Sequence, residues 1–89
     1  MGESERDTMS RLHLEFQDRL PMWVIYNTTT RDHPGRWVVR LHTSLPEPEA
    51  TTLSMVRDSL KAAREALPYG LTCIGRSPDD DPVIYEVWL

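Results

Sequence analysis

A histidine beside a carboxylate is the arrangement in this sequence that most directly suits acid–base chemistry. His33 follows Asp32, and a neighbouring carboxylate favours the charged imidazolium, which suits a general base; the same ring nitrogens suit a metal ion. Side chains of adjacent turn residues usually point apart, so the sequence favours a solvated turn residue over a catalytic one. His42 alternates with Arg40, which predicts that it lies on the open face of a sheet. No two histidines lie four residues apart, as a helical metalloprotease motif requires.

Three consecutive carboxylates, Asp79, Asp80 and Asp81, form a concentrated acidic run. Consecutive side chains project in different directions, whereas Ca²⁺ and Mg²⁺ need several oxygens converging from spaced positions. The run therefore favours a hairpin turn, and we expect no metal ion. A third interpretation is an acidic patch that meets a basic partner, extended by Glu86 if that residue is exposed.

The other reactive side chains indicate no catalytic machinery. Cys73 lies in an apolar stretch and is expected to be a buried, small hydrophobic residue rather than a nucleophile. As the only cysteine it excludes an internal disulfide and any zinc site with two or more cysteines. The sequence has neither a glycine-rich phosphate loop nor a Gly-x-Ser-x-Gly elbow, so we expect no cofactor.

Tryptophans occur in three of the predicted strands. Alternation puts Trp37 on the face of Val39, and Trp88 on the face of Glu86. A tryptophan on the open face beside Arg40 would form an aromatic and arginine-rich patch, as in interface hot spots; in the alternative, all the tryptophans are core residues. The candidate interface residues are Asp79, Asp80, Asp81, Glu86, Trp37, Trp88 and Arg40.

The elements that position these residues follow the order ββαββ. The predicted fold is an α+β two-layer sandwich, in which a four-stranded, mostly antiparallel sheet carries one main helix. The helix crossover is expected to allow some parallel pairing. A stripe at three- and four-residue steps predicts the helix over 52–67, capped by Thr51 or Thr52. The predicted strands are 22–26, 36–42, 71–76 and 83–89, and the stripe is Leu53, Val56, Leu60, Ala63 and Leu67.

The first residues of the chain have two interpretations. A weak helical stripe over 9–20, capped by Ser10 or Thr8, ends at Pro21. In one interpretation 1–21 is an extension, mobile or a short helix, and 22–89 is a single α+β domain that begins near Met22. In the other, an N-terminal helix packs as an integral part of the domain. The stripe consists of Met9, Leu12, Phe16 and Leu20.

Chain length and net charge argue against several classes of protein. A chain of 89 residues with 39% hydrophobic residues is one small domain, which a homodimer would help to stabilise. Fourteen acidic against ten basic residues give a net charge of −4, which argues against direct nucleic-acid binding. No apolar run reaches the roughly 20 residues of a membrane span. The charged first residues do not form a secretory signal, so we expect a cytoplasmic protein without a membrane partner.

Several stretches carry a resemblance to a known group: Trp23–Tyr26, Asp32–Pro34 leading into Trp37–Arg40, Leu67–Leu71 and Asp80–Trp88. Over residues 22–89 the chain resembles a family of short, uncharacterised bacterial and phage proteins with no assigned activity. The resemblance implies a small accessory protein, often associated with mobile elements. It transfers no functional residue.

The leading hypothesis is a small non-enzymatic protein-binding module. Its most concrete form is a phage-type inhibitor of host defence, anti-CRISPR or anti-restriction, whose acidic turn competes for the basic groove of a nucleic-acid-binding complex. One alternative is a homo-oligomeric accessory protein joined through the sheet. Another is a small RNA-acting enzyme or toxin, for which Arg31 and Arg76 would add to a basic rim. The acid–base and phosphate candidates of that enzyme would be His33, His42, Arg36, Arg40 and Tyr85.

Overall fold

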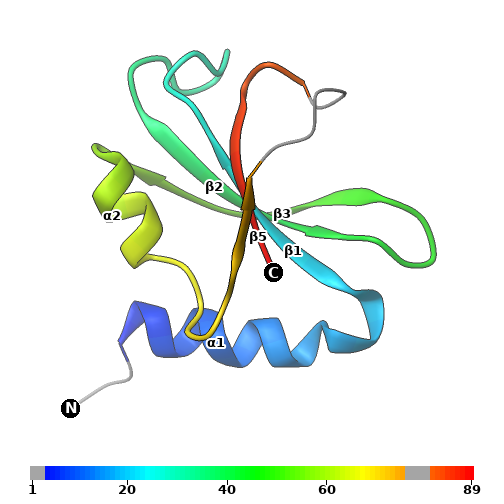
Figure 1. Ribbon diagram of the computed structural model, residues 1–89. Helices are drawn as coiled ribbons and strands as arrows, with labels where there is room; N and C mark the ends of the chain where they lie inside the picture. The colour runs from blue at the N-terminus through cyan, green and yellow to red at the C-terminus, as the bar shows by residue number, and fades with distance from the viewer. Residues whose placement is uncertain (1–3, 76–80) are drawn as a thin grey trace.

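The protein consists of a curved, antiparallel five-stranded sheet and two α-helices (Figure 1). One helix precedes the first strand, and the other lies between the third and fourth strands in the chain. The computed structural model describes residues 4–75 and 81–89. The strand order is β3-β2-β1-β5-β4, and every pairing is antiparallel, so the expected parallel pairing is absent from the described sheet. The α+β class is confirmed. The elements are α1 (Glu5–Glu15), a 3₁₀ helix (Gln17–Arg19), β1 (Pro21–Tyr26), β2 (Trp37–Thr43), β3 (Glu49–Arg57), α2 (Leu60–Glu65), β4 (Cys73–Gly75) and β5 (Ile84–Trp88).

Strand β1 occupies the centre of the sheet, paired with β2 on one side and β5 on the other. Its alternation sends Trp23 and Ile25 to one face, where both are fully buried. Cross-strand pairing places Trp23 opposite Leu41 on β2 and opposite Trp88 on β5. These side chains join one hydrophobic core with residues of both helices. The core therefore lies on one face of the sheet.

Strand β3 replaces the first half of the helix that the sequence predicts over 52–67. The helical stripe and a two-residue alternation coexist here, because Thr51, Leu53 and Met55 also recur at every second position. Those residues are the more buried ones, whereas Thr52 and Ser54 are exposed. Pairing with β2 satisfies the backbone and turns Met55 into the core, opposite Val39. The four-stranded prediction is therefore corrected to five strands.

Helix α2 is consequently short and begins later than predicted. Its N-cap is Ser59, whose Oγ accepts a hydrogen bond from the Ala62 backbone N–H at 3.0 Å, in place of the predicted Thr51 or Thr52. The helix ends at Glu65, and the chain then turns at Gly70, whose φ of +80° suits glycine. Ala63 of the helix, with Leu67 just after it, enters the core.

Helix α1 starts earlier than the predicted 9–20. Ser4 and Asp7 form a capping box, with Ser4 Oγ accepting from the Asp7 backbone N–H at 3.1 Å. Of the predicted stripe, Met9 is buried, and Leu12 and Phe16 pack against the core. Leu20 is exposed, because the chain leaves the helical path at that residue with a positive φ of 49°. No helix in the described part of the chain has the length and apolarity that crossing a bilayer requires.

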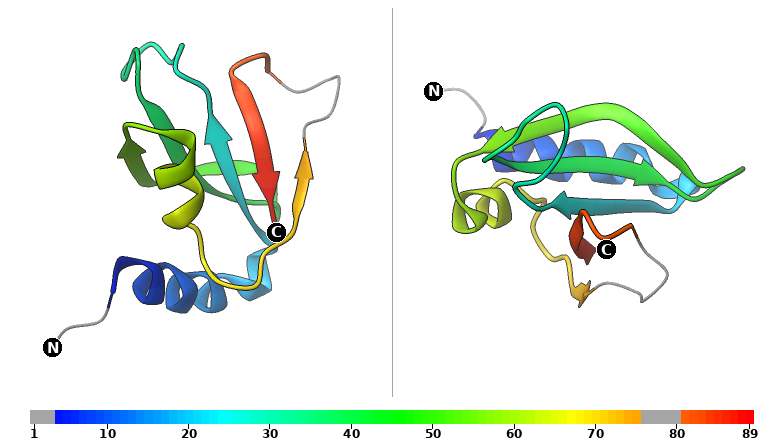
Figure 2. Two further views of the ribbon diagram at one scale, coloured as in Figure 1. Left: turned by 60° about the vertical axis from the view of Figure 1, so that its left-hand side comes forward. Right: turned by 90° about the horizontal axis from the view of Figure 1, so that it is seen from above.

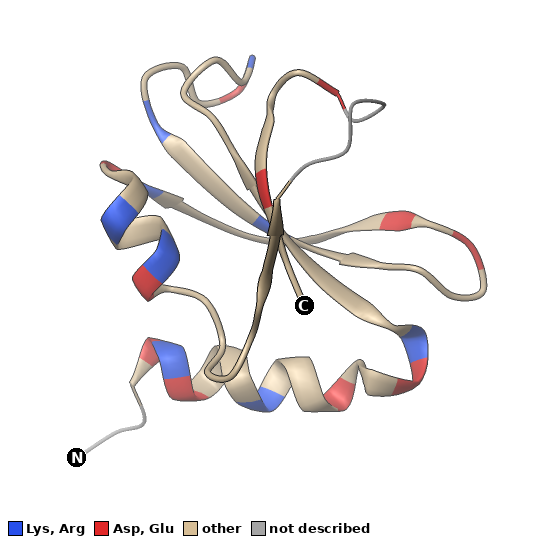
Figure 3. Cartoon of the chain, viewed as in Figure 1, with Lys and Arg blue, Asp and Glu red and all other residues tan. Residues whose placement is uncertain are grey.

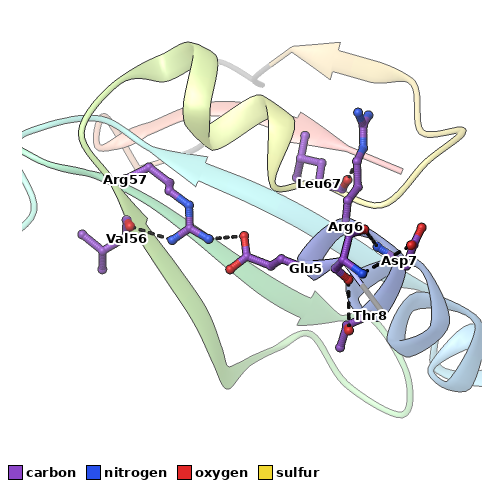
Figure 4. A network of polar contacts seen from close by, with 8 residues as sticks. Glu5, Arg6, Asp7, Thr8, Val56, Arg57 and Leu67 are labelled. Atoms are coloured by element: carbon purple, nitrogen blue, oxygen red, sulfur yellow. Dashed lines mark hydrogen bonds and ion pairs between the residues drawn. The ribbon is translucent and has the colours of Figure 1, made fainter. Parts of the chain in front are cut away.

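Polar contacts fasten α1 to the rest of the fold. The Trp23 indole Nε1–H donates to His13 Nδ1 at 3.0 Å, which joins α1 to the central strand. At the other end of the helix, Arg57 of β3 pairs with Glu5, and Arg6 Nε donates to the carbonyl of Leu67 at 2.9 Å (Figure 4). The start of α1 thus contacts both β3 and the segment after α2.

The two interpretations of residues 1–21 make opposite predictions for Met9. Met9→Ala removes a core side chain, so we expect the free energy of unfolding to fall by about 2 kcal/mol or more. Leu14→Ala, in the same helix but 68% exposed, is the matched control and should change it by less than about 0.5 kcal/mol. Urea denaturation followed by tryptophan fluorescence measures both. Equal, negligible effects would instead show that 1–21 is a separable extension.

Candidate binding pocket on the helix-free sheet face

The face of the sheet opposite the core presents a different set of side chains. Val24 lies beside Arg40, and Tyr26 beside Val38, in the antiparallel register of β1 and β2; His42 is next on the same face. The buried residues of both helices belong to the cluster on the other face. We call the side of the sheet that carries these five residues the helix-free face; Val24 and Val38 are buried there, and the other three are partly exposed.

The loop between β1 and β2 has its own internal hydrogen bonds. Asn27 Oδ1 accepts from the Thr29 backbone N–H at 2.9 Å and from the Thr29 hydroxyl at 2.5 Å. The Gly35 backbone N–H closes the loop by donating to the Thr28 carbonyl at 2.7 Å, and Gly35 has a φ of +80°. Asn27 also donates its backbone N–H to the Val83 carbonyl at 2.8 Å, which ties the loop to the segment entering β5. In both views of the molecule from the side, this loop lies at the end of the sheet away from α1 (Figures 1 and 2).

A pocket of about 320 Å³ lies between this loop and the helix-free face. That volume is at the lower end of the range for ligand sites, about 300–1,000 Å³. Strand and loop residues contribute to it together. It is lined by Tyr26, Thr29, Thr30, Arg31, Asp32, His33, Val38, Arg40 and Val83.

Two polar atoms in the lining residues are buried and unsatisfied. Arg40 Nε and Thr30 Oγ1 have no hydrogen-bond partner among the residues that the structure describes. A buried donor without an acceptor is costly, and a charged one more so. These two atoms are shielded from solvent as well as from the described protein acceptors, so each carries an uncompensated desolvation cost.

Tyr26 and His42 pair with each other beside the pocket. The Tyr26 hydroxyl and His42 Nε2 are 2.6 Å apart. Burial lowers the pKa of His42, and the charge of Arg40 lowers it further. Burial raises the pKa of Tyr26; Arg40 opposes this rise and Asp81 adds to it. At neutral pH the pair is therefore a neutral phenol hydrogen-bonded to a neutral imidazole.

The acidic run lies only partly within the described residues. Asp79 and Asp80 fall outside them, as does Arg76. Asp81 is exposed, and its Oδ1 accepts from the Val83 backbone N–H at 3.0 Å, which is turn geometry. Within residues 4–75 and 81–89, no three His, Cys, Asp or Glu side chains gather into a group able to hold a metal ion.

Glu86 does not extend an exposed acidic patch, because it is buried at 8% exposure. Its carboxylate accepts from Arg64 Nε at 3.0 Å, from a second nitrogen of Arg64, and from the Trp88 indole N–H at 3.0 Å. The hydrogen bonds from Arg64 hold the pKa of Glu86 below its usual value, with that from Trp88 adding to the effect, while burial opposes them. Glu86 thus joins α2 to β5.

The tryptophans lie on the core side of the sheet. Trp23 is fully buried, and Trp37 and Trp88 are partly buried against the core. Trp37 also meets the Tyr85 ring edge-on, with the ring centroids 5.1 Å apart. Among the candidate interface residues that the structure describes, Arg40 lies on the helix-free face, without a tryptophan beside it.

Two further predictions about single residues change. Cys73 is exposed rather than buried, because β4 is a three-residue edge strand. Arg36 does not line the pocket; it pairs with Asp58 at 2.6 Å on the surface. Both helices carry basic and acidic residues (Figure 3).

The structure brings together some residues of the predicted sites and adds others. Arg31, His33 and Arg40, all singled out from the sequence, line one pocket. His42 lies nearby and is bonded to Tyr26. Thr30 carried no signal of a site in the sequence. The Asn27–Thr29 turn was the available hint, because asparagine two residues before a threonine favours a self-bonded loop.

The buried histidines predict that stability falls with acidification. Burial lowers the pKa of His13 and of His42, and His13 Nδ1 must be unprotonated to accept from Trp23. Below the usual value of 6.5 the unfolded chain therefore binds more protons than the folded one. The stabilisation that the two neutral histidines contribute is fully present above pH 6.5. It is lost as the pH falls through the lowered pKa values that these histidines have in the folded protein.

Urea unfolding at about pH 7.5 and about pH 5.5 measures this loss. The doubly substituted His13→Asn/His42→Asn protein should lose less stability between these values than the wild type. An equal loss of stability in both proteins would show that the two histidines do not cause the pH dependence.

The placements of Glu86 and Asp81 predict unequal effects of removing one carboxylate charge. Glu86→Gln breaks a charge-assisted pair with Arg64 in a buried setting, so it should lower the thermal midpoint clearly. Asp81→Asn keeps the Oδ1 acceptor of an exposed turn and should leave the midpoint nearly unchanged. Calorimetry measures the thermal midpoints of both variants and of the wild type. Equal midpoints would show that Glu86 has no structural role.

Comparison of the chain with protein-family models, with curated proteins and with solved structures found no match to any of them.

Proposed function

We propose that this chain is a non-enzymatic module that binds a protein partner stoichiometrically through the pocket on its helix-free face. One observation carries the proposal: the face opposite the core holds a pocket lined by arginine, histidine, tyrosine and threonine side chains from two strands and a self-bonded loop. Mixed polar groups that converge on a small concave site are typical of recognition. The sheet lies between this site and the core, which both helices cover on the other face.

The protonation chemistry beside the pocket supports binding over catalysis. A general acid–base pair needs two groups that exchange protons near neutral pH. His33 lines the pocket, but His42 is engaged by the Tyr26 hydroxyl. Burial lowers the pKa of His42 and raises that of Tyr26, so neither is poised to change charge at neutral pH.

The most concrete form of this function, an inhibitor of a CRISPR or restriction complex, stays a prediction from the sequence. It depends on the acidic run, of which Asp81 alone lies within the described residues. A homo-oligomer is a distinct outcome, in which the partner is a second copy of the chain.

A site-specific cross-link tests the proposal. A photoreactive amino acid replaces His33 at the exposed rim of the pocket, and in the matched control it replaces Lys61, exposed on α2. Tagged proteins are irradiated in bacterial lysates that contain CRISPR or restriction complexes, treated with nuclease and analysed by mass spectrometry. We expect a stoichiometric, nuclease-resistant adduct with one protein from position 33 and none from position 61.

Other adducts would contradict the proposal. Equal capture from both positions would show that the pocket is not the binding surface. An adduct with a second copy of the chain would support the homo-oligomer, and an adduct with RNA alone would remove the protein partner.

A second candidate, a small RNA-acting enzyme, is favoured by one observation: His33 and Arg40 share the pocket. An imidazole beside a guanidinium suits proton transfer next to a phosphate. If the chain cleaves RNA, His33→Ala should abolish cleavage, whereas a binding module should show no RNA cleavage in either form.

A further inference from the structure

A second pocket, of about 300 Å³, lies between the start of α1, helix α2 and the segment that leads into β4. It shares no lining residue with the pocket on the helix-free face. Three basic side chains line it, together with the exposed Glu65 and the partly buried Leu71 and Trp88. The second pocket thus combines positive charge with an apolar wall. The basic residues are Arg6, Lys61 and Arg64.

Arg6 is anchored along one edge of its guanidinium and is unbonded along the other. Its Nε donates to the carbonyl of Leu67 at 2.9 Å, and its Cζ lies 4.4 Å from the centroid of the Tyr69 ring. Its two terminal nitrogens donate to no acceptor among the described residues, and both are accessible to solvent. Figure 4 shows them pointing away from the other side chains drawn. A fixed guanidinium with an accessible free edge is a preorganised donor for an oxyanion.

Arg64 is oriented in a similar way by a different partner. Its Nε and one terminal nitrogen donate to the carboxylate of the buried Glu86, which leaves the other terminal nitrogen without a described acceptor. The side chain of Arg64 is 46% exposed. Lys61, three residues earlier on α2, is exposed and forms no ion pair with a carboxylate in the described part of the chain. Three cations with unused donors therefore border one pocket.

The charges favour a small anion over a polyanion. The three cations outnumber Glu65, and Glu86 balances the charge of Arg64, which leaves an excess of one positive charge at the pocket. The whole chain, in contrast, has a net charge of −4, which would repel a nucleic-acid strand. Salt screens charges over about 8–10 Å, so an anion inside the pocket senses mainly the residues that line it.

The apolar wall favours an anion that carries an apolar group. Leu71 and Trp88 are only partly buried, so each offers hydrophobic surface to a ligand. The Trp88 indole N–H already donates to Glu86, so the indole contributes contact area rather than a hydrogen bond. The volume is at the lower end of the range for small-molecule ligands, about 300–1,000 Å³. An inorganic anion alone would leave this hydrophobic surface in contact with water.

We propose that the second pocket binds a small organic anion, in which an oxyanion group is joined to an apolar body the size of a ring. Arg6, Lys61 and Arg64 hold the oxyanion, which is a carboxylate or a phosphate monoester, while Leu71 and Trp88 contact the apolar body. Charge-assisted hydrogen bonds from the two anchored guanidinium groups orient the ligand. The site is independent of the protein partner proposed above, because the two pockets share no residue.

Titrations followed by ¹H–¹⁵N NMR of the full chain, at neutral pH and constant ionic strength, test the second pocket. The probes are benzoate and phenyl phosphate, which have the same ring and different oxyanions. Benzamide keeps the ring without the charge, whereas acetate and inorganic phosphate keep the charge without the ring. We expect saturable shifts of the Leu71 amide and the Trp88 indole N–H with benzoate or phenyl phosphate, and weaker binding of the other three compounds. The tighter of the two aromatic anions identifies the oxyanion.

Two variants assign the binding to the named cations. Lys61→Gln removes an exposed charge and should weaken binding of the tighter aromatic anion about two- to fivefold. Arg6→Lys keeps the charge but removes the planar donor edge, and should weaken this binding about threefold or more. Arg11→Gln is the matched control, because it removes one positive charge from α1 outside the pocket, and should leave the affinity nearly unchanged. Lys61→Gln covers the case in which Arg6→Lys fails to fold.

Four results would overturn the inference. The first is the absence of a saturable shift with either aromatic anion. The second is binding of benzamide, or of acetate and phosphate, that is as tight as binding of the aromatic anions. The third is wild-type affinity in Lys61→Gln or in Arg6→Lys, and the fourth is a set of shifts confined to residues 29–33, which line the other pocket. None of these results bears on the cross-link from position 33, so failure here leaves the proposed function in place.

Discussion

The Trp23 indole holds the two layers of this protein together. It is fully buried at the centre of the sheet, packed between its cross-strand neighbours Leu41 and Trp88, and its N–H is bonded to His13 of α1. A buried indole N–H needs an acceptor, and the neutral imidazole of His13 supplies one from the helix that precedes β1 in the chain. The position of α1 against the sheet, and with it the place of Met9 in the core, follows from this contact.

The same strand gives the protein its two faces. Because β1 is paired on both sides, its alternation is strict: Trp23 and Ile25 enter the core, while Val24 and Tyr26 face the opposite side. Both helices pack on the core side, so the core and the pocket lie on opposite faces of the sheet. The charged Arg40 is compatible with the fold because it lies on the face that forms a pocket rather than the core.

Residue composition made much of the sheet predictable from the sequence, and long-range pairing decided the rest. The strands at 22–26, 36–42 and 83–89 were correctly expected, because these stretches are rich in β-branched and aromatic residues. The stretch 49–57 supports two periods at once, and only the presence of β2 beside it selects the strand. The pocket depends on where the loop closes, so Arg40 and His33 could be named individually but their convergence with Thr30 could not.

The exchange rate of the Trp23 indole N–H with solvent tests the central contact most directly. NMR should show strong protection relative to free tryptophan near neutral pH, because the proton is buried and bonded to His13. The protection should decline as the pH falls through the pKa of His13, which burial lowers below 6.5, because protonation of the ring removes the acceptor. An indole proton that exchanges as fast as in free tryptophan at neutral pH would contradict this account of the fold.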